Sequence, residues 1–191
     1  MFLNIHQIYY NNETKSQLLK EFTPFYNPDC TLFFESSVIR ELIENKEHKK
    51  SEYFGVVGPK FKQKISKWKK NREYLGYENL KKCIYNNNTD VISLMYTGRS
   101  HNPLFLAEKY HPGFNEIFSN LLKLVNFEYK SCKLSTPLYC NTFVAKKHFW
   151  EHYTQELMFP IMDILRENKN PICKKACKPA RYGELPLKMQ K

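Results

Sequence analysis

The chain has 191 residues, of which 42% are hydrophobic and 15% aromatic, and its formal net charge at pH 7 is +11. This composition excludes a disordered chain, because it supplies enough apolar side chain for the core of a domain. No apolar run approaches the roughly 20 residues that span a bilayer, and "MFLNIHQIYY" lacks the basic lead of a signal peptide. We therefore expect a cytoplasmic protein with an anionic partner.

The first half of the chain alternates between strand and helix patterns. "FLNIHQIYY" predicts a first strand, because apolar, aromatic and β-branched residues alternate in it. "PFYNPDC" predicts a loop, since its two prolines disfavour regular structure. "FFESSVIRELIEN" has apolar residues at helical spacing, which predicts an amphipathic helix, and "EYFGVVG" predicts a second strand that closes at a Gly-Pro turn.

The second half continues this alternation after a basic stretch over 60–70. "VISLMY" predicts a fully buried third strand, and "LFLAEKY" and "FNEIFSNLLKLVNF" predict two helices. "YCNTFVA" predicts a fourth strand, followed by a long helix that Pro160 kinks or divides. The pattern predicts one α/β layered domain over residues 1–168, with a mostly parallel central sheet flanked by helices. A basic, proline-containing tail follows over 169–191.

Several kinds of chemistry are excluded by the residues themselves. The sequence has no glycine-rich phosphate loop. It contains only three aspartates, Asp29, Asp90 and Asp163, so a D-x-D metal motif cannot exist. Cys173 and Cys177 form C-x3-C without a second pair of ligands at suitable spacing. We therefore expect no metal or other cofactor, and six cysteines that remain free thiols.

Polar and aromatic side chains at the predicted strand ends are the first candidates for ligand binding. His6, Gln7, Tyr9 and Tyr10 lie at the end of the first strand, where they can stack on and hydrogen-bond a base or sugar. The alternative is ordinary strand packing. Lys60 follows the Gly-Pro turn after the second strand and can pair with a phosphate as a point charge. The alternative there is a turn with a surface lysine.

Glu108 and His111 are the candidates for catalysis. They lie within one turn of each other in "AEKYHPGF", so they are the general acid and base candidates of the chain. The alternative is a helix end marked by Pro-Gly.

The stretch "YCNTFVAKKHFW" is the last candidate site. Cys140, Asn141, Thr142 and Phe143 open a short apolar strand, and the amide of Asn141 suits sugar hydroxyls. Lys146 stands at the following helix start, where a cation is unusual unless an anionic ligand binds nearby. An ordinary strand–helix junction with a solvated lysine is the alternative.

In this order, the motifs resemble those of a known family. "IHQIYY", "YFGVVGPKF", "HPGF" and "YCNTFVAKKHFW" are similar to stretches of bacterial glycosyltransferases of polysaccharide biosynthesis, of the capsular and mannosyl type, over about 2–165. The resemblance implies a GT-A-like fold with His6 to Tyr10 near a nucleotide and residues 140–143 at the sugar. Relatives continue beyond the final helix, so it also implies a C-terminally truncated copy. Without D-x-D, lysines or arginines would neutralise the diphosphate.

The resemblance implies transfer of a sugar from a nucleotide-sugar donor to a cell-surface polysaccharide or glycolipid acceptor. Two alternatives stay open. One is a catalytically inactive α/β protein that binds a sugar or a partner. The other is a nucleic-acid-binding protein, favoured by the net charge and by lysines interleaved with Trp68 and Tyr74. The basic run over 60–70 also predicts peripheral contact with an anionic membrane or with phosphates.

Overall fold

The computed structural model describes residues 3–28, 33, 35–61, 63, 77–87, 89–94, 103–128 and 142–167. The chain forms two compact units. One comprises Met1–Ser100 with Leu134–His152, and the other His101–Lys133 with Tyr153–Lys191. The single domain predicted over 1–168 is thus divided between two units, and the predicted tail lies outside the described residues.

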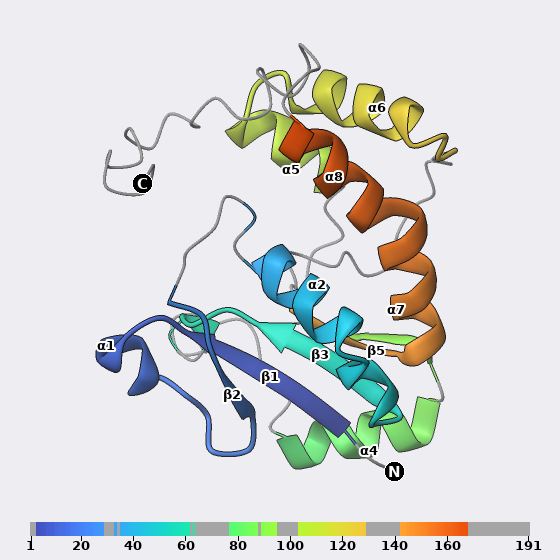
Figure 1. The fold of residues 1–191 in the computed structure, drawn as a ribbon. Coiled ribbons are helices and arrows are strands. Elements are labelled where there is room, and N and C mark those ends of the chain that lie inside the picture. Colours follow the sequence, from blue (N-terminus) through green and yellow to red (C-terminus); the bar gives the residue numbers. More distant parts are fainter. Residues whose placement is uncertain are drawn as a thin grey trace. The chain divides into compact units, whose positions relative to one another are not determined.

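A five-stranded sheet forms the centre of the first unit (Figure 1). Its strands are β1 (Leu3–Tyr9), β2 (Thr23–Tyr26), β3 (Tyr53–Val57), β4 (Val91–Ser93) and β5 (Phe143–Lys146), in the order β2-β1-β3-β5-β4. β1 pairs in parallel with β2 and β3, whereas β5 pairs antiparallel with β3 and β4. The predicted α/β class is confirmed. The sheet is mixed, because β5 alone runs against the other four strands.

The two edge strands of this sheet differ from what the sequence predicted. Thr23–Tyr26 is β2, which pairs with β1 through a register that places Pro24 opposite Gln7, so the loop predicted for "PFYNPDC" is wrong over 24–26. An edge strand tolerates a proline, because one side of it needs no ladder donor. "VISLMY" is only half-buried at Val91 and Ser93, since β4 is the other edge.

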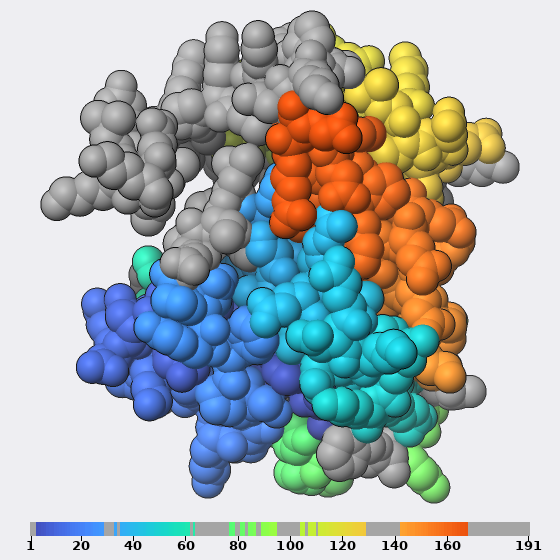
Figure 2. Space-filling view, viewed as in Figure 1, coloured from blue at the N-terminus to red at the C-terminus, as the bar shows by residue number. Residues whose placement is uncertain are grey.

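Helices cover both faces of the sheet within the first unit. α2 (Glu35–Glu44) and α4 (Tyr77–Asn87) lie on opposite faces (Figure 1). The amphipathic helix predicted around α2 is confirmed, and its buried residues are Val38, Ile39, Leu42 and Ile43. The 3-10 turn η1 (Glu47–Lys49) follows α2 on the same layer, and together they form an outer surface that abuts α7 (Lys147–Tyr153; Figure 2).

The core of the first unit comes from alternate strand residues. On the α4 face, Leu3, Ile5, Tyr53 and Val57 pack with Ile84. On the α2 face, Phe54 is fully buried and its ring lies 5.5 Å from that of Trp150 in α7. Both faces of β1 are therefore buried, so this strand does not show the simple alternation of a half-exposed strand.

The described part of the second unit is helical. α5 (Pro103–Tyr110) and α6 (Phe114–Leu124) confirm the two predicted helices. A π-helical segment (Thr154–Met158) separates α7 from α8 (Phe159–Glu167), as the division at Pro160 predicted. Proline clashes with the carbonyl four residues earlier, and the wider turn, in which Phe159 N–H bonds Thr154 O, relieves this. No helix in the described ranges is long and apolar enough to cross a membrane.

Candidate functional site at the carboxyl edge of the sheet

The topology of the first unit marks one position in the sheet. The chain passes from β1 to β2 on one side and then crosses to β3 on the other side of β1. The strand order therefore reverses between β1 and β3. In open α/β sheets, ligands bind beyond the carboxyl ends of the strands at such a switch point. We call the end of the sheet where β1, β3 and β4 finish its carboxyl edge, and the opposite end its amino edge.

The reversed direction of β5 brings its first residues to the carboxyl edge. Phe143 pairs with Ser93, the last residue of β4, and Thr142 O accepts a hydrogen bond of 2.8 Å from Leu94 N. Thr142 and Phe143 are both buried, and the Phe143 ring stacks on Trp150 at 5.0 Å. Cys140 and Asn141, the other two predicted ligands of this stretch, lie outside the described residues.

Tyr9 and Tyr10 lie where β1 reaches the carboxyl edge. The Tyr9 ring lies 5.1 Å from that of Tyr26 at the end of β2, and Lys15 Nζ approaches the Tyr9 ring to 5.8 Å. Tyr26 is 55% exposed, although its position at a strand end would allow it to be covered. Tyr10 is half-buried and its backbone N–H donates to Thr14 Oγ1 at 2.8 Å. The edge thus carries an accessible pair of aromatic rings beside a cation.

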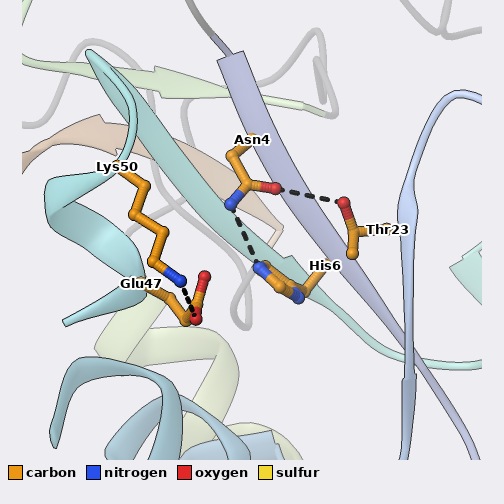
Figure 3. Close-up of polar contacts among 5 residues, drawn as sticks. All are labelled: Asn4, His6, Thr23, Glu47 and Lys50. Carbon is orange, nitrogen blue, oxygen red and sulfur yellow. Dashed lines mark hydrogen bonds and ion pairs between the residues drawn. The ribbon is translucent and has the colours of Figure 1, made fainter. Parts of the chain in front are cut away.

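His6 and Gln7 lie earlier in β1 and are both buried, with Gln7 opposite Val57, the last residue of β3. Gln7 has no exposed surface: its Oε1 accepts from Leu19 N at 2.8 Å and its Nε2 donates to Gln17 O at 3.2 Å. His6 Nε2 lies 3.1 Å from Asn4 Nδ2, and Asn4 Oδ1 accepts from Thr23 Oγ1 (Figure 3). Gln7 therefore joins the segment before β2 to the sheet.

The turn after β3 provides the other half of the switch point. Phe61 N donates to Gly58 O at 3.1 Å, which closes the turn and leaves Lys60 exposed. Glu35, at the start of α2, lies against this turn. A methyl group at Gly58 would lie 2.5 Å from Glu35 Oε1. No other described residue holds the Glu35 carboxylate by a hydrogen bond or ion pair.

Three residues of this edge, Tyr26, Glu35 and Asn27, were not among the predicted site residues. Glu35 opens a predicted helix, and only its tertiary contact with Gly58 sets it apart from the other surface carboxylates. Asn27 follows β2, and its backbone N–H donates to Tyr9 O at 2.9 Å. Its Nδ2 is buried without a hydrogen-bond partner. Such an unpaired buried donor is uncommon in folded proteins.

The position of Lys146 contradicts the prediction that it lies beside the start of this stretch. It pairs with Tyr53, the first residue of β3, and so lies at the amino edge. Strand residues rise about 3.3 Å each, so Lys146 and Phe143 are about 10 Å apart along β5. Lys146 Nζ instead lies 3.3 Å from Asp90 Oδ1, and His148 Nε2 lies 3.3 Å from Asp90 Oδ2. Lys146 therefore lies at the opposite end of β5 from Thr142 and Phe143.

Glu108 and His111 belong to the second unit. Glu108 Oε1 accepts from Gly113 N at 2.7 Å and its Oε2 accepts from Asn115 N at 2.8 Å. These two hydrogen bonds hold the pKa of the Glu108 carboxyl below its usual value, and the one from the Asn115 amide has the larger effect. Glu108 is therefore a cap for the start of α6, next to the left-handed Gly113, and His111 is exposed beside it. A carboxylate held in this way is a poor proton donor.

Within the described ranges, no group of three or more His, Cys, Asp or Glu side chains is arranged to hold a metal ion. Comparison of the chain with protein-family models, curated proteins and solved structures gave no significant match.

Proposed function

We propose that this chain binds a nucleotide sugar at the carboxyl edge of its sheet and transfers the sugar to a saccharide or lipid-linked acceptor. The observation that carries this proposal is the switch point between β1 and β3. Aromatic rings, a lysine and a carboxylate that no described residue pairs with arrive there from four separate segments of the chain. The sequence resemblance to polysaccharide glycosyltransferases supports the choice of ligand.

In this proposal, the aromatic pair holds the base and Lys60 holds the diphosphate. A base stacks on the exposed ring of Tyr26, and such a contact contributes about 1–3 kcal/mol. Lys60 is exposed at the turn after β3 and acts as a point charge that offsets the charge of the phosphates. The sequence has no D-x-D motif, so lysines supply the charge that a cation would supply in metal-dependent relatives.

Glu35 is the proposed general base in place of Glu108 and His111. The acceptor hydroxyl oxygen attacks the anomeric carbon and forms the new glycosidic bond, while its proton passes to the Glu35 carboxylate. The bond between the anomeric carbon and the diphosphate oxygen breaks, and the nucleoside diphosphate leaves with the electron pair. Glu35 suits this role because no described residue competes for its carboxylate, whereas two backbone amides occupy that of Glu108.

Binding measurements can test this proposal directly. A panel of nucleotide sugars is titrated calorimetrically against the full chain, with single-stranded DNA as the competing ligand and salt as a variable. We expect one nucleotide sugar to bind with a modest salt dependence. A preference for DNA that collapses steeply with salt would contradict the proposal and favour the nucleic-acid alternative.

A matched pair of tyrosine variants locates the site. Tyr26→Ala should weaken nucleotide-sugar binding about tenfold, which corresponds to roughly 1.4 kcal/mol of lost stacking. Tyr85→Ala is the control, because Tyr85 is 81% exposed on α4, which is not among the segments that form the proposed site. Equal losses in both variants, or none in Tyr26→Ala, would place the ligand elsewhere. Binding without transfer to any acceptor would favour the inactive sugar-binding alternative.

A further inference from the structure

Two histidines are buried on the α2 face of the sheet, outside the proposed site. His48 is 2% exposed and His6 is 6% exposed. Both rings lie against Phe54 of β3, at centroid distances of 6.5 Å for His48 and 5.6 Å for His6. His6 also contacts Phe25 of β2 at 6.3 Å. The outer segment η1, which carries His48, is thus joined to the sheet through one aromatic ring shared by two titratable groups.

The hydrogen bonds around His6 suit only its neutral form. Asn4 Nδ2 is a donor, so the ring nitrogen Nε2 that faces it at 3.1 Å accepts and the proton resides on Nδ1 (Figure 3). Nδ1 is buried with no partner. Protonation would place a second N–H opposite the Asn4 amide and leave a charged ring with an unsatisfied donor. The nearby charges are Glu47 and Lys50, which pair with each other at 2.6 Å.

Among the described residues, the carboxylate that faces His48 is already paired with a lysine. Both of its ring nitrogens are buried without a hydrogen bond. Glu151 of α7 lies 3.6 Å from His48 Nε2, but it already pairs with Lys49 at 2.9 Å. Lys147 of the same helix adds a further positive charge. A protonated His48 would therefore share one carboxylate with a lysine, inside a layer that keeps it from water.

The backbone beside η1 gives this segment a place to bend. Lys46, between α2 and η1, has φ of 61° and lies in the left-handed region that side chains other than glycine rarely adopt. Release of η1 from the sheet would let Lys46 return to an ordinary conformation. The strain and the buried histidines thus favour the same movement.

We propose that His6 and His48 form an acid-triggered release, in which their protonation frees the segment that follows α2, from Lys46 to Ser51, from the face of the sheet. Burial, the largest cause in each case, lowers the pKa of both rings below the usual value. The unfolded or released state therefore binds more protons below about pH 6.5. The attachment is complete above that pH and is lost as pH falls from there through the lowered pKa values.

Hydrogen exchange of the full chain tests this release. We expect the protection factors of amides in 46–52 to fall at least tenfold between about pH 7.5 and pH 5.5, a change of roughly 1.4 kcal/mol. Amides of α6, which carries no histidine, serve as the internal reference and should keep their protection. Unchanged protection in 46–52, or an equal fall in α6, would overturn the proposal. The experiment uses the unmodified chain, so it does not depend on whether a histidine variant folds.

Fluorescence of Trp150 provides a second readout. Its indole Nε1 donates to Phe54 O at 2.8 Å, so the ring reports on the strand that both histidines contact. In a Trp68→Phe background, Trp150 is the sole tryptophan. Its emission should shift in the same pH window, and His48→Gln should abolish most of that shift. His111→Gln, at an exposed position of the second unit, should leave it intact. Persistence of the full shift in a His6→Gln, His48→Gln variant would exclude the histidines as the trigger.

Discussion

The two edges of the sheet differ in how their polar side chains are satisfied. At the amino edge, Lys146 of β5 and His148 of α7 both pair with Asp90, the residue before β4. At the carboxyl edge, the Glu35 carboxylate has no partner among the described residues, and Tyr26 is 55% exposed. Folding stability does not require an unpaired carboxylate or an exposed aromatic ring. The carboxyl edge therefore has the features of a binding site, whereas at the amino edge these charged side chains are paired with one another's partner, Asp90.

The same contrast separates the two carboxylates considered for catalysis. Glu108 is held by two backbone amides and stabilises the start of α6. Glu35 lies against a glycine turn and keeps its lone pairs available. A catalytic group is better assigned to an unsatisfied side chain at a switch point than to one whose hydrogen bonds are complete.

The largest expected effect is on the rate of sugar transfer, when the Glu35 carboxylate is replaced. Glu35→Gln should reduce kcat for sugar transfer at least a hundredfold, because removal of a general base costs about 10²–10⁴ in rate. Nucleotide-sugar affinity and thermal stability should change little. The control is Glu13→Gln, an exposed carboxylate of α1 (Asn12–Lys15). Steady-state kinetics of both variants measure this effect. A decrease in kcat of less than about threefold in Glu35→Gln would show that Glu35 is not the general base.

Two glycines, Gly55 in β3 and Gly58 in the turn after it, should separate folding from function. Gly55→Ala would place a methyl 2.7 Å from Phe143 O and 2.8 Å from Val144 Cγ1, so the β3–β5 pairing must shift. We expect it to lower the free energy of unfolding by roughly 1–3 kcal/mol. Gly58→Ala meets only the movable end of Glu35 and should cost within about 0.5 kcal/mol while it reduces transfer. Denaturant unfolding and transfer kinetics of both variants measure these effects. A larger loss of stability in Gly58→Ala than in Gly55→Ala would refute the account.

The amino edge should show a pH dependence of its own. Hydrogen bonds from His148 and then Lys146 lower the pKa of the exposed Asp90 carboxyl. The ion pairs therefore stabilise the fold above the usual aspartate pKa of about 3.9, and this contribution is lost as pH falls below it. Thermal unfolding of wild type and Asp90→Asn should differ slightly at pH 7 and converge below about pH 4. A difference that is independent of pH would contradict this account.

The smallest expected effect is that of a chelator. With no D-x-D motif in the sequence, we expect nucleotide-sugar affinity to change less than about twofold when EDTA is added. Calorimetric titration with and without EDTA, followed by addition of Mn²⁺, measures this. Affinity that disappears with EDTA and returns with Mn²⁺ would show that carboxylates outside the predicted pattern hold a metal.

Sequence periodicity was sufficient for most elements of this protein. The apolar spacing of α2 and α6, the buried strand β3 and the division at Pro160 all follow from local side-chain patterns. Such patterns report which face of a segment is apolar and where the backbone cannot continue. They also placed Tyr9 and Lys60 at strand ends, since a strand end is a local property.

Strand order and direction were decided only by the tertiary structure. Nothing in "YCNTFVAKK" indicates that β5 runs against its neighbours, yet that direction places Phe143 at the carboxyl edge and Lys146 at the amino edge. Pro24 is compatible with a strand only because β2 is at an edge. Likewise, Glu35 differs from other surface carboxylates only through its contact with Gly58. Local sequence sets which segments form strands and helices, whereas long-range packing decides which side chains meet.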